Sequence, residues 1–394
     1  MNNAFVPNQP PPAAPMIARP SGHQSVLKII LGVFAAMMAA LLGLIVLLMI
    51  GAETGPVEMI IGLICASLPV PIYVMLLLWI DRYESEPLGM LATAFFWGAL
   101  VAVFIALILN TFNERVVAAA TNSLHVARNF GAVISAPLVE ESSKAFIVLV
   151  LFFFKKDEFD GIIDGIIYAG MVGLGFAMTE NVLYYGRAAQ QGPEALTVIF
   201  VMRGMAAPFF HPLATSMTGI GLGWSRQSDN GFVKVTAPVL GFMFAVLIHG
   251  TWNGFATYGS AAAFFAAYFL IMGPAFIVTL MVIAFSLRRE GRIVRQYLYP
   301  DFRRGFCDPQ EYERLCSVSG RIGLCWNAFT TGGFSEWRRR KRFNQLASEL
   351  AFHRSRVNRR LARTSQMTPE HDQVYLVSLQ QVRQQMIRRP DRNV

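Results

Sequence analysis

Charged residues are scarce in this sequence. Only 15% of its 394 amino acids are Asp, Glu, Lys or Arg, whereas soluble domains average about 25%. A soluble enzyme is therefore a poor expectation, and the 54% hydrophobic fraction excludes a disordered chain. Cysteine is scarce too, since the whole chain contains four, and this excludes a disulfide framework.

The few charges are unevenly distributed. Residues 287–394 hold 22 Lys/Arg and 10 Asp/Glu, a net charge of +12. Residues 1–286 hold the remaining 12 Lys/Arg and 15 Asp/Glu, a net charge of −3. The chain is thus an apolar, slightly acidic body followed by a basic tail.

Long apolar runs dominate the body. A helix needs about 20 apolar residues to cross a bilayer core of about 30 Å. We therefore predict an all-α polytopic membrane protein with about eight transmembrane helices, near 27–50, 57–80, 88–109, 130–154, 161–185, 196–224, 236–258 and 261–286. A Pro-rich segment, residues 1–26, precedes this membrane core (27–286) and is expected to be disordered.

The tail, residues 287–394, is predicted to be soluble, helical and cytoplasmic. Lys and Arg collect in the N-terminal segment, in the tail and in the loops near 81–87, 155–160 and 225–235. The positive-inside rule then places these loops and both termini in the cytoplasm. We expect the tail to form helices that contact anionic lipid. It has no nucleic-acid recognition motif, so no nucleic acid is expected as a partner.

Ionisable residues inside the apolar runs are the strongest functional signal. Such a group costs several kcal/mol in a bilayer and indicates a functional site by default. Four of the spans have none deep in their cores, and the fourth to seventh carry Glu140, Glu141, Lys144, Asp164, Glu180, Arg203, His211 and His249. Asp164 is expected near the cytoplasmic end, where it pairs or caps a helix. Glu140, Glu180 and His249, with His211 near the middle of the membrane, are predicted to converge in its outer half.

The fifth span also carries a series of small residues four positions apart: Gly161, Gly165, Ala169, Gly173 and Ala177. Small residues at this spacing let a neighbouring helix approach closely. Ala169, Gly173 and Ala177 lie near Glu180 in helical angle, so the closely packed face also presents that carboxylate.

Peptide hydrolysis in a membrane needs water, a base to activate it and donors for the developing oxyanion. The predicted catalytic set that offers these groups is Glu140, Glu141, Glu180, His211, His249 and Asn253, supported by Lys144, Asn181 and Arg203. A zinc mechanism is the alternative, because His211, His249 and Glu141 match the His₂Glu set of zinc peptidases, although no HExxH motif is present. Spacing leaves both a cofactor-free glutamate mechanism and a zinc mechanism open.

Several linked motifs resemble those of the PrsW family of intramembrane proteases. They occur in the family's order over roughly residues 60–285: Asp81-Arg82-Tyr83-Glu84-x-Glu86-Pro87, Glu140-Glu141-x-x-Lys144, Phe159-Asp160-Gly161, Glu180-Asn181-x-x-Tyr184, His211-Pro212 and His249-x-x-x-Asn253.

That family is similar in turn to the CAAX prenyl proteases, whose motifs are EExxxR, FxxxH and HxxxN. This chain departs from the first two, with Lys144 one position early and Ala207 in place of Phe.

The resemblance implies that Glu140 is the base, that Glu141 assists it, and that His249 and Asn253 stabilise the oxyanion. It also implies an integral protein of a bacterial-type cytoplasmic membrane. The substrate would be a single-span membrane protein, an anti-sigma factor cut in regulated proteolysis. Two other classes remain open: a non-catalytic scaffold or receptor, and a proton-coupled transporter. Two spatially inverted halves would favour the transporter, and the sequence shows no such internal symmetry.

Overall fold

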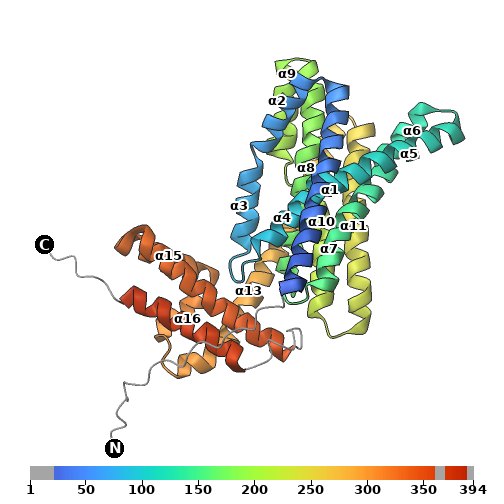
Figure 1. The fold of residues 1–394 in the computed structure, drawn as a ribbon. Helices are drawn as coiled ribbons and strands as arrows, with labels where there is room; N and C mark the ends of the chain where they lie inside the picture. The colour runs from blue at the N-terminus through green and yellow to red at the C-terminus, as the bar shows by residue number, and fades with distance from the viewer. Residues whose placement is uncertain (1–21, 360–368, 388–394) are drawn as a thin grey trace, which may run out of the picture.

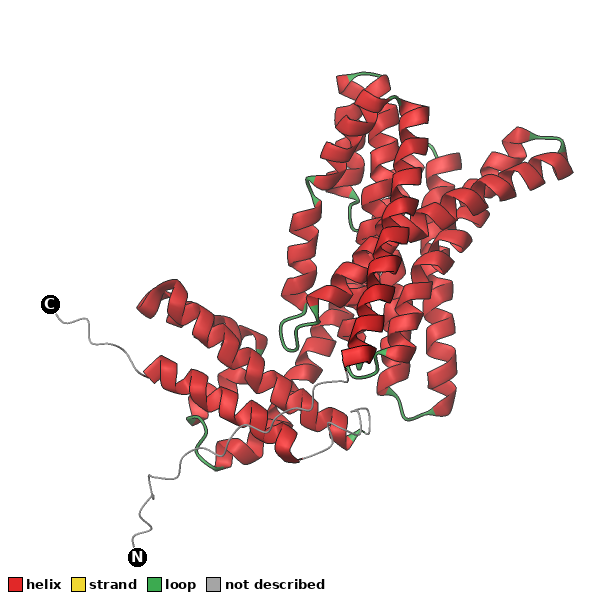
Figure 2. Cartoon of the chain, in the orientation of Figure 1, coloured by secondary structure: helices red, strands yellow, loops and turns green. Residues whose placement is uncertain are grey.

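The computed structural model describes residues 22–359 and 369–387. Every regular element among them is helical, as predicted (Figure 2). The Pro-rich segment as far as residue 21 lies outside the described residues, as do residues 360–368 and 388–394. The first half of the chain forms α1 (Gly22–Thr54), α2 (Pro56–Ser67), α3 (Val70–Ile80), α4 (Leu88–Phe96), η1 (Trp97–Ala102), α5 (Val103–Thr121), α6 (Leu124–Phe130), η2 (Gly131–Ser135), α7 (Ala136–Phe154) and α8 (Ile162–Gln190).

The second half completes the membrane core and builds the tail. Its elements are α9 (Pro193–Phe200), η3 (Val201–Ala206), α10 (Phe210–Gln227), α11 (Gly231–Tyr258), α12 (Ala261–Ala267), η4 (Tyr268–Met272), α13 (Gly273–Arg303), α14 (Pro309–Leu315), α15 (Val318–Asn358) and α16 (Pro369–Ile387). The four η segments are π-helical turns, which often occur at functional sites. The boundary predicted at residue 287 falls inside α13, which continues from the core into the tail.

Seven helical segments of the described chain are long and apolar enough to cross a membrane. They are Ile29–Thr54, Pro56–Ile80, Leu88–Thr121, Ile162–Gln190, Pro193–Gln227, Gly231–Tyr258 and Ala261–Arg303. The predicted span near 130–154 is not among them, because α7 carries Glu140, Glu141 and Lys144 within 19 residues. These charges are buried among other helices, so α7 lies in the bundle without being apolar throughout.

Helix α8 is the central element of the bundle, and most of its residues are buried. Its small residues allow α10 to pack against it: a Cβ on Gly165 would lie 2.1 Å from the carbonyl oxygen of Gly219, and one on Gly173 2.7 Å from that of His211. No side chain fits at these distances. The predicted close helix approach is therefore confirmed, and it brings His211 of α10 next to α8.

Three interhelical loops and the tail meet at one end of the bundle. Arg356 of α15 pairs with Glu84 and lies 3.7 Å from a carboxylate oxygen of Asp160. Arg359 donates to the carbonyl oxygen of Arg226 at 3.0 Å. The first turn of α1 and the end of α13 lie at this end as well (Figure 1). This arrangement agrees with the predicted grouping of the loops, and the cytoplasmic side remains a prediction.

Asp164 caps the start of α8 at this end, as expected. Its Oδ2 accepts the backbone N–H groups of Asp160 at 2.8 Å and Gly161 at 2.6 Å. A carboxylate in the first helical turn also interacts favourably with the helix dipole.

The tail is helical, as predicted, and it packs against the bundle. Within α15 the backbone reverses at Gly333, whose φ of 70° suits glycine. The two arms of this hairpin are joined by Arg321, which donates to the carbonyl oxygen of Asn344 at 2.5 Å. One apolar core runs from Tyr83 and Leu91 in the membrane core to Phe343 and Leu350 in the tail.

Candidate active site

The predicted polar residues of five helical segments converge inside the bundle. Helix α7 contributes Glu140, Glu141 and Lys144, and α8 contributes Glu180 and Asn181. Arg203 belongs to the π-helical segment η3, His211 to the first turn of α10, and His249 to α11. Most of these side chains are buried, so the site is a polar cluster within an apolar surround.

Lys144 is the centre of the cluster. Its Nζ lies 2.9 Å from Oε1 of Glu141 and 3.4 Å from Oε2 of Glu140. The same ammonium group lies 3.1 Å from Nδ1 of His211 and 3.8 Å from the centre of the Phe176 ring. A single buried cation therefore contacts both adjacent carboxylates and a histidine on another helix.

A second branch runs from His211 to Arg203. Nε2 of His211 lies 2.9 Å from Oε2 of Glu180, and that carboxylate also pairs with Arg203. Nε of Arg203 donates to Oδ1 of Asn181 at 2.7 Å. The guanidinium also stacks on the ring of Tyr184, with 3.8 Å to the ring centre. Glu180 thus serves as the link between the histidine and the arginine.

The neighbours of each histidine determine which ring nitrogen carries its proton. An ammonium group has donors only, so Nδ1 of His211 accepts from Lys144 and Nε2 donates to Glu180. An ionised carboxylate only accepts, so Nδ1 of His249 donates to Oε1 of Glu141 at 2.9 Å. A neutral His249 then presents the lone pair of Nε2 to Oε2 of Glu140, 3.7 Å away.

This last pair distinguishes Glu140 from the other carboxylates of the cluster. A lone pair and a carboxylate oxygen face each other across 3.7 Å, too far for a direct hydrogen bond. Three carboxylates and only two cations, Lys144 and Arg203, form the cluster, so it carries a net charge of −1 when the histidines are neutral. A buried unbalanced charge is costly. A proton between Glu140 and His249 would neutralise it, and a divalent metal ion there would change the net charge from −1 to +1.

The donor chemistry fits a zinc ion. Glu140, His211 and His249 each offer one ligand atom, and these atoms lie within 4.8 Å of one another. Two histidines and one glutamate are the ligands of several zinc peptidases. Glu141 hydrogen-bonds the far nitrogen of His249, as carboxylates do behind metal-bound histidines. The glutamate of this group is Glu140, whereas the sequence-based set contained Glu141. To bind the metal, His211 would have to give up its hydrogen bond with Lys144 or the one with Glu180.

A cavity of about 220 Å³ reaches the cluster, and His211, Arg203, Asn181 and Tyr184 line it together with apolar residues that include Trp252 and Phe264. Asn181 and Tyr184 belong to the second half of α8, which leads away from the tail end of the bundle. Access to the cluster is thus from the half of the bundle opposite the tail.

Two residues differ from the sequence-based site. The amide of Asn253 donates to the carbonyl oxygen of Ala132 in η2 at 2.9 Å, so it contacts backbone and no carboxylate of the cluster. Thr215, absent from the predicted set, donates to Oε2 of Glu141 at 3.0 Å. Thr215 follows His211 by one helical turn, and this spacing was the signal in the sequence that could have found it.

Residues 86–280 match the sequence model of the PrsW family of intramembrane metalloproteases. The chain is 30% identical to "Protease PrsW" of Bacillus subtilis over 173 residues, which cover 44% of this chain and 72% of the relative. It is 27% identical to "Protease PrsW" of Oceanobacillus iheyensis over 207 residues, 52% of this chain and 86% of the relative.

A shorter match is closer in sequence. The chain is 39% identical to "Protease PrsW" of Geobacillus kaustophilus over 107 residues, which cover 26% of this chain and 43% of the relative. No solved structure matches the chain. The family match ends at residue 280, so the tail, residues 287–394, lies outside it.

Proposed function

The chain belongs to the PrsW family of intramembrane proteases, and from this premise we propose that it hydrolyses a peptide bond of a membrane-anchored protein with Glu140 as its general base. The observation that carries the proposal is the position of Glu140. Its carboxylate faces the free nitrogen of His249 in a buried cluster with one negative charge in excess. A carboxylate in that position readily takes up a proton, as a general base must.

The neighbouring side chains have distinct tasks in this mechanism. Glu141 holds His249 through Nδ1 and is itself held by Lys144 and Thr215. His211 and Arg203 line the cavity, so they are available as donors to a peptide carbonyl bound there. Glu180 orients both, since it binds Nε2 of His211 and the guanidinium of Arg203. The amide of Asn253 would first have to break its hydrogen bond to the carbonyl oxygen of Ala132 before it could stabilise the oxyanion.

Zinc would be held by Glu140, His211 and His249. Bound there, it would supply Lewis-acid polarisation of the scissile carbonyl. Glu141 would keep its position behind His249 in either mechanism, because its contact is with Nδ1, the nitrogen that faces away from Glu140.

The substrate that we propose is a single-span membrane protein, of the anti-sigma-factor type that the family resemblance implies. Its cleavage site would enter the cavity from the half of the bundle opposite the tail. We place the protein in a bacterial-type cytoplasmic membrane with both termini in the cytoplasm. This orientation puts the basic tail beside the inner leaflet, where it contacts anionic lipid.

The test is the substitution Glu140→Gln in cells that co-express a tagged single-span substrate. We expect cleavage to be abolished while expression and membrane insertion stay unchanged. Glu58→Gln is the matched control, because Glu58 lies in the first turn of α2, outside the cluster, and should leave cleavage intact. Undiminished cleavage by the Glu140 variant would contradict the proposal and favour a scaffold, in which the cluster only aligns helices.

A further inference from the structure

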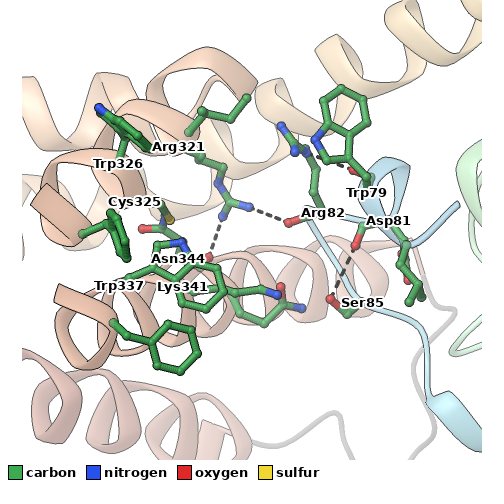
Figure 3. Close-up of a pocket in the computed structure, with 15 residues that line it drawn as sticks. Trp79, Asp81, Arg82, Ser85, Arg321, Cys325, Trp326, Trp337, Lys341 and Asn344 are labelled. Atoms are coloured by element: carbon green, nitrogen blue, oxygen red, sulfur yellow. Dashed lines mark hydrogen bonds between the residues drawn. The ribbon is translucent and has the colours of Figure 1, made fainter. Parts of the chain in front are cut away.

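A second cavity, of about 630 Å³, lies between the membrane core and the tail. One wall is the end of α3 and the following loop, with Trp79, Asp81 and Arg82. The other wall is the α15 hairpin, which contributes Trp326 and Trp337 among others. Figure 3 shows these two groups on opposite sides of the cavity, with Arg321 reaching between them. The family match starts at residue 86, so both walls lie outside it.

Polar atoms without a partner are concentrated around this cavity. Among the described residues, seven buried side-chain atoms make no hydrogen bond, and four of them belong to residues that line the cavity. Two are donors, Nη1 of Arg82 and Nε2 of Gln345, and two are acceptors, Oδ1 of Asp81 and Oδ1 of Asn344. Unsatisfied buried groups cost free energy. These atoms are enclosed, so a ligand in the cavity would reach them only after a small rotation of their side chains. A ligand with both anionic oxygens and hydroxyl groups would then offer partners to the donors and to the acceptors.

The charge around the cavity favours an anion. Arg82, Arg321 and Lys341 line it against a single carboxylate, Asp81. Arg321 is occupied within the protein, where it donates to the carbonyl oxygens of Leu315 at 3.0 Å and Arg82 at 3.1 Å. Arg321 therefore holds the two walls together, and recognition of an anion is left to Arg82 and Lys341.

The remainder of the lining is aromatic and lies at the end of a membrane span. Trp79 is next to the last residue of the span Pro56–Ile80. Trp326 and Phe334 of the hairpin are 65% and 61% exposed, and Trp79 is 52% exposed. Tryptophan at such a position is typical of the membrane interface. A ligand with an apolar part and a charged head, anchored in the bilayer, matches this place.

We propose that this cavity binds the headgroup of an anionic phospholipid that carries free hydroxyls, as phosphatidylglycerol does. The phosphate accepts from Arg82 and Lys341, and the glycerol hydroxyls donate to Asn344 and Asp81. The part of the acyl chains next to the headgroup lies against Trp79 and Trp326. The site joins the protease core to the tail, so the bound lipid stabilises the docked position of the α15 hairpin. This binding is independent of the peptidase mechanism.

The experiment is a lipid titration of the full-length protein, purified in detergent and stripped of lipid, with native mass spectrometry as the readout of binding. We expect short-chain phosphatidylglycerol to bind at least tenfold more tightly than phosphatidylcholine. Phosphatidic acid has the charge without the hydroxyls and is expected to bind at an intermediate affinity. Equal binding of all three lipids would overturn the proposal. If free sn-glycerol 3-phosphate binds as tightly as phosphatidylglycerol, the ligand is a soluble phosphate and the proposed lipid is wrong.

Two variants and a control locate the site. Lys341→Gln and Asn344→Leu should each weaken phosphatidylglycerol binding by about tenfold, the factor that about 1.4 kcal/mol represents. Arg342→Gln removes the same charge from an exposed neighbour outside the cavity and should bind as the wild type does. Lys341 is exposed, so its replacement tests the site even if Asn344→Leu fails to fold. Unchanged affinity in the Lys341 variant would contradict the proposed site.

Discussion

Nδ1 of His249 on α11 lies 2.9 Å from Oε1 of Glu141 on α7. This contact separates the roles of two adjacent carboxylates. Glu141 is fully enclosed by His249, Lys144 and Thr215, whereas Glu140 faces the free nitrogen of His249. In the mechanism that we propose, Glu141 therefore positions the histidine, and Glu140 is the general base.

We predict that Glu141→Gln lowers kcat/KM by about 10- to 100-fold, the effect typical of residues that orient a site. The glutamine oxygen still accepts from Nδ1 of His249, but the lost charge draws Lys144 toward Glu140. Glu140→Gln should abolish activity altogether. Purified protein and a peptide substrate measure both. Equal losses in the two variants would show that the carboxylates do not differ in role.

Thr215 and Thr218 provide a matched pair on α10. Thr215 donates to Glu141, whereas the hydroxyl of Thr218 is buried without a partner. Thr215→Val should lower the free energy of unfolding by about 1.5–3 kcal/mol, as expected for a hydrogen bond to a charged group. Thr218→Val should be neutral or stabilising. Thermal denaturation in detergent measures both, and the reverse order would contradict the assigned hydrogen bonds.

Close packing of α8 on α10 predicts a large effect of one methyl group. A Cβ on Gly219 would lie 2.0 Å from the carbonyl oxygen of Gly165, so the helices must separate in Gly219→Ala. We expect destabilisation of about 1–3 kcal/mol or more and reduced activity, since α10 carries His211. Gly89→Ala, with nothing within 4 Å of its Cβ, is the control and should retain full stability.

Metal content discriminates between the two mechanisms that the sequence left open. If zinc occupies Glu140, His211 and His249, the purified protein should contain about one equivalent. His249→Ala should then lose it, and a chelator should abolish activity until zinc is restored. Elemental analysis measures the content independently of activity. Full activity in metal-free protein would establish the glutamate mechanism.

The loop before α4 predicts a pH dependence of stability. Burial raises the pKa of Asp81 from 3.8 to about 7, while the backbone N–H of Glu86 opposes this shift and the charge of Asp164 adds to it. A carboxyl group whose pKa is raised by folding binds its proton more tightly in the folded state than in the unfolded state. It therefore stabilises the fold fully below pH 4, and this contribution is lost as the pH rises through 7.

Asp81→Asn removes that titration. Between pH 4 and 7 the wild type should lose a few kcal/mol relative to the variant, because one pKa unit corresponds to about 1.4 kcal/mol. Thermal denaturation of both proteins across this range, without added lipid, measures the difference. Parallel stability curves would show that Asp81 titrates normally.

The sequence alone determined the class of the protein and the content of its site. Apolar runs long enough to cross a bilayer are a local property, and so is an ionisable residue within such a run. Glu140, Glu180, His211 and His249 could therefore be selected without a structure. The small residues of α8 predicted the close contact with α10, since helical spacing places them on one face. The fold class follows from the same patterns, and the family was indicated by the resemblance of the linked motifs.

Only the tertiary structure decided how these groups face one another. Adjacent carboxylates such as Glu140 and Glu141 have the same local sequence signal, and the rotation of α7 against α10 and α11 determines which one reaches His249 through its Nδ1. The partner of Asn253 depends in the same way on the position of η2. The lipid cavity joins residues more than 240 positions apart, Trp79 and Trp326 among them. No local pattern encodes the proximity of these residues, because it arises only when the tail docks on the bundle.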